Sequence, residues 1–242
     1  MRTMAKMLAA LAFMVALSAA LAISGQADMV IDFDVVGPTG SITFAGGTNP
    51  LIGTNIPITS VAGLGTPSHS SPLPPAPSIT YPITGGVLNF KTGNFASYYA
   101  PLKIWDFNGG GELTITGTVW DGSDVVAQDY LVFNGYFQSA YVTASGNIFF
   151  IAMAIFTDNK NADLLTFFGV PWAIGQSLGG SLNLQFTGTG SGGGAIATTS
   201  IVSGDVANSI PIPTPSTLLL LGSGLAGLVG LRYRRRKADA KI

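Results

Sequence analysis

The chain has 242 residues, of which 47% are hydrophobic and 10% are charged, and it contains no cysteine. This length suits one domain with a substantial core. Without cysteine, disulfide bonds, cysteine–zinc sites and thiol nucleophiles are excluded. Charge is unevenly distributed, because residues 28–209 hold eleven acidic residues and three lysines, a net charge of −8. An acidic segment of this kind repels phosphate backbones, so no nucleic-acid partner is expected.

The N-terminal residues 1–27 have the composition of a secretory signal peptide. Arg2 and Lys6 form a basic start, residues 8–22 are apolar, and small residues lead up to Ala27. We predict cleavage after Ala27, with Ala22 as the second choice. An uncleaved membrane anchor is the alternative, and in either case we expect residues 28–209 to be exported.

The segments that follow are typical of short antiparallel strands. In residues 30–35, Ile31, Phe33 and Val35 alternate with polar or smaller residues, which predicts a half-buried strand. Residues 147–156 are almost continuously apolar and predict a central strand buried on both faces. Further strands are predicted at residues 41–45, 54–59, 87–91, 102–107, 112–120, 125–133, 137–143, 181–187 and 195–206.

Turn-forming residues separate these strands. Glycine-containing turns at 108–111, 121–122, 134–135 and 146–147 supply the positive φ angles that tight hairpins require. Residues 63–82 are rich in proline, serine and glycine and predict a long surface loop, with a linker between two domains as the alternative. Residues 163–168 fit a strand or one helical turn capped by Asn161, and we favour the turn. The predicted fold class is all-β, an antiparallel β-sandwich of jelly-roll type.

Few side chains in residues 28–209 offer catalytic chemistry. His69 lies in the proline- and serine-rich loop, where we expect a solvated residue rather than a member of a catalytic triad. A glycosidase pair would need Glu112 with Asp106 or Asp129. Glu112 follows three glycines and is interpreted as an exposed turn residue. We therefore expect no enzyme activity, no catalytic residue and no cofactor.

Two oxygen-rich stretches, residues 121–129 and 158–163, are candidates for calcium, which takes about six to eight oxygen ligands. Neither matches an EF-hand loop, and Lys160 lies within the second. We interpret both as ordinary turns and predict no metal site.

Aromatic residues are candidates for stacking on sugar rings. Trp105 and Trp120 lie on predicted strands, where core packing is the expected role. Tyr98, Tyr99 and Trp172 lie in less regular stretches, and these three are the predicted ligand-binding residues.

The C-terminal residues 210–242 have three parts in a fixed order. Prolines at 211, 213 and 215 keep the chain extended, and residues 217–231 form an uncharged apolar stretch. As a helix at about 1.5 Å per residue, this stretch covers roughly 22 Å of a hydrocarbon core of about 30 Å. We predict a transmembrane helix whose basic end stays in the cytoplasm. The basic residues that follow are Arg232, Arg234, Arg235, Arg236 and Lys237.

This tripartite tail resembles the PEP-CTERM sorting signal of Gram-negative bacterial surface and matrix proteins. The resemblance rests on Pro213-Thr214-Pro215, the leucine-rich stretch with Gly-Ser-Gly, and the arginine cluster. Thr214 stands where the signature has glutamate. The resemblance implies recognition by an exosortase, a membrane-embedded cysteine protease, with an anchored intermediate in the inner membrane before release to the cell surface or extracellular matrix. It covers the tail and assigns no activity to the domain before it.

The sequence thus predicts an exported β-sandwich with a structural or adhesive role at the cell surface or in a biofilm matrix. The first alternative is a carbohydrate-binding module that contacts extracellular polysaccharide, which an exposed coplanar set of aromatic residues would mark. The second is a secreted hydrolase, which requires carboxylates that converge in a cleft.

Overall fold

The computed structural model describes residues 29–71, 79–190 and 192–210. The predicted signal peptide, transmembrane helix, Pro213-Thr214-Pro215 motif and basic tail lie outside these residues. Among the residues described, no helix combines the length and the apolar character needed to span a membrane.

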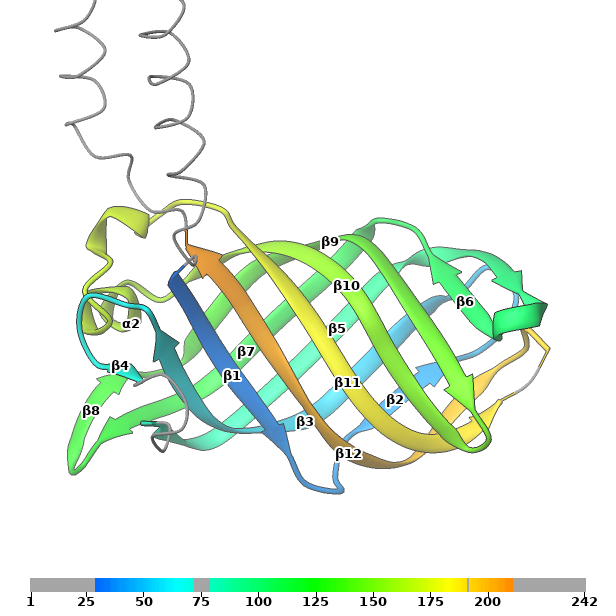
Figure 1. Ribbon diagram of the computed structural model, residues 1–242, viewed down its shortest axis with the longest axis horizontal. Helices are drawn as coiled ribbons and strands as arrows, with labels where there is room; N and C mark the ends of the chain where they lie inside the picture. Colours follow the sequence, from blue (N-terminus) through cyan, green and yellow to red (C-terminus); the bar gives the residue numbers. More distant parts are fainter. Residues whose placement is uncertain (1–28, 72–78, 191, 211–242) are drawn as a thin grey trace, which may run out of the picture. The chain divides into compact units, whose positions relative to one another are not determined.

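Twelve strands form a single sheet (Figure 1), in which all pairings except that of β3 with β4 are antiparallel. The predicted all-β class is therefore confirmed. The strands are β1 (Met29–Val36), β2 (Ser41–Phe44), β3 (Pro50–Leu64), β4 (Ser70–Ser71), β5 (Tyr81–Tyr99), β6 (Ile104–Phe107), β7 (Gly110–Asp121), β8 (Asp124–Ala127), β9 (Tyr130–Ser145), β10 (Ile148–Lys160), β11 (Leu178–Gly190) and β12 (Ile196–Ile210).

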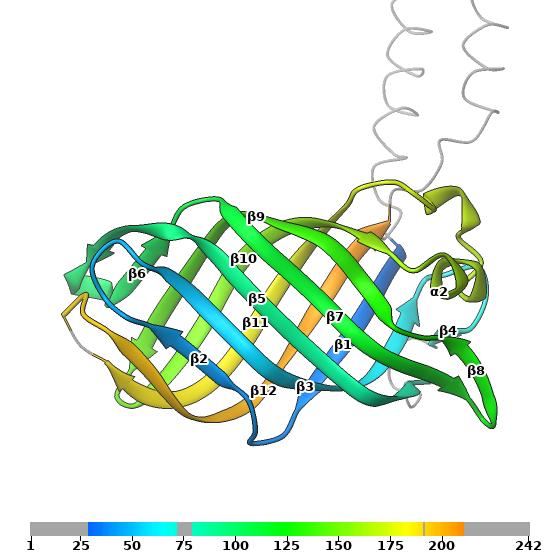
Figure 2. The same cartoon turned by 180° about the vertical axis from the view of Figure 1, so that it is seen from behind.

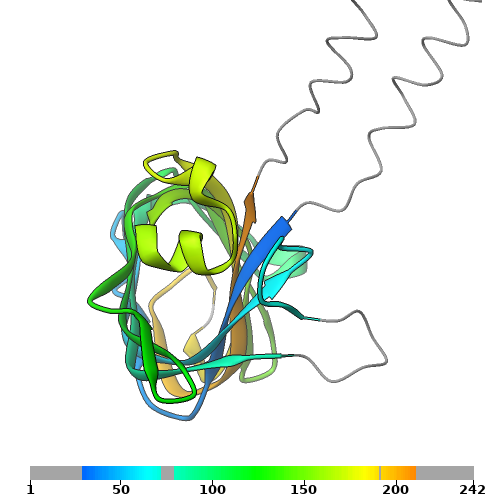
Figure 3. The same cartoon turned by 90° about the vertical axis from the view of Figure 1, so that its left-hand side faces the viewer.

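The sheet closes on itself, where the sequence led us to expect two packed sheets. The pairings run β1–β3–β5–β7–β9–β10–β11–β12, and β12 pairs with β1. Figure 3 shows the strands encircling the interior. The longest strands have 19, 16 and 15 residues and contain register shifts, which increase bending and twist. Long, bent strands curl around one core, so that each finds a partner on both edges.

Two positions in the ring are each filled by a pair of strands joined in line. Both β1 and β2 lie between β3 and β12, and both β6 and β7 lie between β5 and β9, as Figure 2 shows from behind. Residues 108–111, predicted as a hairpin turn, are instead the break between β6 and β7 and the first two residues of β7. The backbones approach closely here, since a Cβ on Gly111 would lie 1.8 Å from the carbonyl oxygen of Lys91.

A second predicted hairpin, residues 134–135, lies inside β9. Leu113 of β7 pairs with Gly135, whereas Ile115 pairs with Val132, so β9 bulges at this point. The predicted strand 125–133 is instead divided between β8 and β9. The turns predicted at 121–122 and 146–147 are confirmed by the β7–β8 and β9–β10 pairings.

The core fills the interior of the closed sheet. In β1, Ile31, Phe33 and Val35 are buried as the alternation predicts. The prediction that residues 147–156 are buried on both faces is wrong, because Phe150 and Ile155 are 37% and 44% exposed. A single closed sheet places one face of every strand toward solvent, and these two side chains are on that face.

A short helix covers one end of the ring (Figure 3). The helix is α2 (Ala162–Phe167), and Asn161 Oδ1 accepts hydrogen bonds from the backbone N–H groups of Asp163 and Leu164. The helical turn predicted at 163–168 with an Asn161 cap is thus confirmed. A 3₁₀ turn, η3 (Pro171–Ala173), follows α2.

Aromatic side chains pack at the other end of the ring. The ring centroids of Phe44 and Phe107 are 5.2 Å apart in an edge-to-face arrangement, and Phe149 stacks on Phe186 at 5.3 Å. The Trp105 indole N–H donates to the carbonyl oxygen of Gly194 over 3.2 Å. This bond ties the β11–β12 connection to the core.

Candidate binding site on the outer face of the sheet

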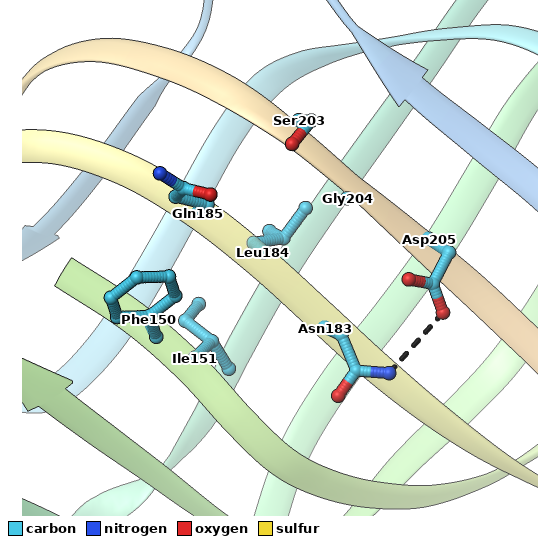
Figure 4. A pocket seen from close by; sticks show the side chains of 8 residues that line it. All are labelled: Phe150, Ile151, Asn183, Leu184, Gln185, Ser203, Gly204 and Asp205. Carbon is cyan, nitrogen blue, oxygen red and sulfur yellow. Dashed lines mark hydrogen bonds between the residues drawn. The ribbon is translucent and has the colours of Figure 1, made fainter. Parts of the chain in front are cut away.

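A hollow of about 270 Å³ lies on the outer face across β10, β11 and β12. Its side chains come from neighbouring positions of the ladder, because Phe150 pairs with Gln185 and Gln185 with Ser203. Figure 4 shows the Phe150 ring on one side of the hollow and Asp205 on the other. The lining residues are Phe150, Ile151, Asn183, Leu184, Gln185, Ser203, Gly204 and Asp205.

The hollow combines one aromatic surface with amide, hydroxyl and carboxylate groups. The Asn183 amide donates to Asp205 Oδ2 over 3.2 Å, which fixes the orientation of both side chains. An amide and a carboxylate provide donors and acceptors for hydroxyl groups. An exposed aromatic ring provides an apolar surface for a flat ligand. This is the chemistry of a small polar ligand with one apolar face.

A row of polar side chains extends from the hollow onto β1 and β3. Asp34 pairs with Asp205 on one side and with Ser60 on the other, and the Ser60 hydroxyl donates to Asp34 Oδ2 over 2.5 Å. Nearby on β1, Asp32 is partly buried, and burial raises its pKa to about 6, with further contributions from the charges of Asp205 and Asp34. The hollow therefore has an acidic border.

The predicted aromatic residues do not form one platform. Tyr98 packs on Trp105 with ring centroids 4.8 Å apart, while Tyr99 is 56% exposed at the end of β5. Tyr81, at the opposite end of the same strand, contacts Phe167 of α2. Trp172 lies in η3 beside that helix and is 38% exposed. Tyr98 and Tyr99 are thus at one end of the ring and Trp172 at the other.

His69 is exposed, as expected for a loop residue, and one face of its ring contacts α2. Its ring stacks on Phe167 with centroids 3.7 Å apart, and Nδ1 lies 2.7 Å from the Phe167 carbonyl oxygen. A carbonyl oxygen can only accept, so Nδ1 carries a proton. His69 fastens the segment before β4 to α2.

The carboxylates considered for hydrolysis are separated along the sheet. Along β5, Lys91 faces Glu112, whereas Ser97 faces Asp106. Six residues of strand span roughly 20 Å, whereas glycosidase carboxylates are about 5–10 Å apart. Asp129 lies beside Gly117 through the bond from the Gly117 N–H to its carbonyl oxygen, and five residues of β7 span roughly 16 Å from Glu112.

The two calcium candidates have other roles. Asp121 and Asp124 pair across the β7–β8 turn, and both are exposed. Asp158 points into the core, where it forms an ion pair with the Lys160 ammonium. The lysine, rather than a metal ion, is therefore the partner of this carboxylate. The part of the chain that the structure describes contains no group of three or more histidine or acidic side chains arranged to hold a metal ion.

Sequence reasoning missed the hollow because its aromatic residue lies within an apolar run. Whether Phe150 points inward or outward depends on the register of β10, which shifts between Ile151 and Ala154. The phase of the alternation before that shift, with Phe149 inward and Phe150 outward, was the available signal.

The described residues form an all-β domain made of one closed sheet with a polar hollow on its outer face. In a comparison with known protein families, residues 211–236 match the family model for the PEP-CTERM protein-sorting motif. Neither the curated proteins nor the solved structures provide a match.

The chain therefore carries a PEP-CTERM sorting motif, which indicates export, and the resemblance noted in its tail is confirmed. The motif indicates processing by an exosortase, a membrane protein, after transient anchoring in the membrane.

Proposed function

We propose that the domain acts outside the cell as a structural or adhesive component of the cell surface or extracellular matrix. The observation that carries this proposal is the sorting motif attached to an acidic, closed-sheet domain. The separation of Glu112 from Asp106 and Asp129 favours a non-catalytic role over the hydrolase alternative.

Incubation of the exported protein with panels of polysaccharides and esters tests the non-catalytic role. We expect no turnover above that of buffer. Turnover that is lost in Glu112→Gln would contradict the proposal and support the hydrolase.

The hollow favours a second candidate function, carbohydrate binding, at a place other than Tyr98, Tyr99 and Trp172. One face of a pyranose ring carries C–H groups that pack against an aromatic ring, and its hydroxyl groups form hydrogen bonds with amides and carboxylates. Phe150, Asn183, Gln185 and Asp205 provide these groups within a hollow of about 270 Å³. A volume of this size suits one or two sugar rings rather than a long buried chain.

Calorimetric titration with neutral oligosaccharides tests this candidate. Phe150→Ala is expected to weaken binding about tenfold, because one aromatic contact contributes roughly 0.5–1.5 kcal/mol beyond its buried area. Ile155→Ala is the matched control, since Ile155 is exposed on the same strand outside the hollow. Equal losses in the two variants, or undiminished binding in Phe150→Ala, would place the sugar elsewhere.

A further inference from the structure

Three polar side chains are enclosed within the closed sheet, among the apolar residues of the core. Asp158 and Lys160 are on β10, and Asn208 is on β12, with exposures of 0%, 3% and 0%. The strand β11 lies between them, because Gly180 pairs with both Phe156 and Asn208. The three side chains therefore meet on the inner face of the sheet, over Gly180 of β11, where no side chain separates them.

One carboxylate holds the other two groups. The Lys160 ammonium donates to Asp158 Oδ1 and Oδ2 over 2.6 Å and 2.5 Å, and the Asn208 amide N–H₂ donates to the same two oxygens over 3.1 Å. Asn208 Oδ1 is buried without a hydrogen-bond partner. The Lys160 Nζ atom lies 6.0 Å from the centre of the Phe33 ring.

Burial shifts both ionisable groups toward their neutral forms. It lowers the pKa of Lys160 to about 8, against the opposing effect of Asp158. It raises the pKa of Asp158, although Lys160 and Asn208 act in the other direction. Transfer of one proton from the ammonium to the carboxylate gives a neutral amine and a carboxylic acid without any exchange with solvent. A neutral amine is a nucleophile, and a carboxylic acid can activate an amide carbonyl.

We propose that this cluster is a self-modification site, at which Lys160 and Asn208 join through an isopeptide bond with Asp158 as the acid and base. The Lys160 Nζ lone pair attacks Asn208 Cγ, and the Nζ–Cγ bond forms. The Cγ–Nδ2 bond then breaks, and Nδ2 leaves as ammonia. Asp158 takes the proton that the lysine nitrogen loses and delivers a proton to the departing nitrogen. The step consumes no oxidant, reductant or second substrate.

The unpartnered amide oxygen fits this role for Asp158. When Asp158 is protonated, a turn of the Asn208 amide about its Cβ–Cγ bond places Oδ1 against the acid, which then donates to it. The same contact stabilises the negative charge that develops on Oδ1 during attack. Gly180 provides the space, because a Cβ there would lie 2.5 Å from Asn208 Nδ2.

The product would connect β10 to β12 and enclose residues 161–207, which include α2 and η3, in a covalent loop. A cross-link of this kind restricts the unfolded chain as a disulfide does. It is available to a chain without cysteine and does not depend on the redox state of the surroundings.

A tryptic map of the denatured full-length protein, purified from a host without an exosortase and incubated at pH 8, tests the proposal. An acylated Lys160 is not cleaved, so we expect residues 104–232 as one fragment that lacks one ammonia. Cleavage after Lys91 and Lys103 in the same sample is the internal control. Recovery of separate, unmodified fragments 104–160 and 161–232 would overturn the proposal, whatever the stability of any variant.

Ring closure of Asn208 with its own backbone also releases ammonia, and the map separates the two reactions. A cyclised Asn208 leaves fragment 161–232 lighter but still separate from 104–160, which would contradict the cross-link. Lys160→Arg and Asp158→Ala are each expected to abolish the ammonia loss. Asn147→Asp, in the exposed turn between β9 and β10, is expected to leave it unchanged.

Discussion

Asp32 is the residue whose environment most clearly opposes its charge on the outer face. It is partly buried, Asp34 and Asp205 lie nearby, and one of its oxygens, Oδ1, has no hydrogen-bond partner. Asp34 and Asp205 face each other directly across β1 and β12. Like charges in this position are destabilising.

This environment makes stability depend on pH in a defined direction. The pKa of Asp32 is raised from 3.8 to about 6 on folding, so between these values the folded state binds a proton that the unfolded chain has released. The free energy of unfolding therefore falls as pH rises from about 4 to 6. After allowance for solvent screening of this partly exposed group, the loss is about 1–2 kcal/mol.

Asp32→Asn is expected to remove this loss. The variant should be more stable than the parent by about 1 kcal/mol at pH 7 and similar to it near pH 4, as measured by urea unfolding. Asp121→Asn, in the exposed β7–β8 turn, is the control. A difference between Asp32→Asn and the parent that stays constant with pH would contradict the assignment.

At the scale of elements, glycines at close backbone approaches decide where the strands bend. Gly135 lies in the bulge of β9, and a Cβ at this position would lie 2.4 Å from the carbonyl oxygen of Leu113. Backbone cannot move aside as a flexible side chain can. Gly135→Ala is therefore expected to reduce stability by about 1–3 kcal/mol.

Thermal or urea unfolding of Gly135→Ala beside Gly179→Ala checks this expectation. Gly179 is the second residue of β11 and has no atom within 4 Å of an added Cβ, so its substitution should change stability by less than about 0.5 kcal/mol. Equal effects of the two substitutions would mean that glycine entropy, rather than the close approach in β9, determines the cost.

The sequence predicted well those elements whose signals are local. Alternation in β1 identified its buried face, and Asn161 identified the start of α2, because both signals act within a few residues. Asn134-Gly135 and the glycines at 108–111 have the composition of hairpin turns. Their actual role depends on the partner strand, since Leu113 and Lys91 come close to them from other parts of the chain.

At the scale of the molecule, the closure of the sheet was beyond sequence reasoning. It depends on the pairing of Met29 with Ile210, at opposite ends of the described domain, and no local pattern marks such a distant pair. The core residues were predictable from alternation whether the strands form one sheet or two. The outer hollow was not, because it requires the register of three strands at once.

At the scale of the whole chain, we infer that the tail directs sorting and processing. Pro213-Thr214-Pro215 precedes the apolar stretch and lies within the matched sorting motif. Replacement of Pro213, Thr214 and Pro215 by alanine is expected to leave the protein uncleaved in the membrane fraction. Normal release of this variant would show that another segment is recognised.

Mass spectrometry of the form released from cells that contain an exosortase tests the claim most directly. We predict a released protein that includes the domain through Ile210 and lacks residues 217–242, with the longer form confined to membranes. A released protein with its C-terminus intact through Ile242 would contradict processing at the motif.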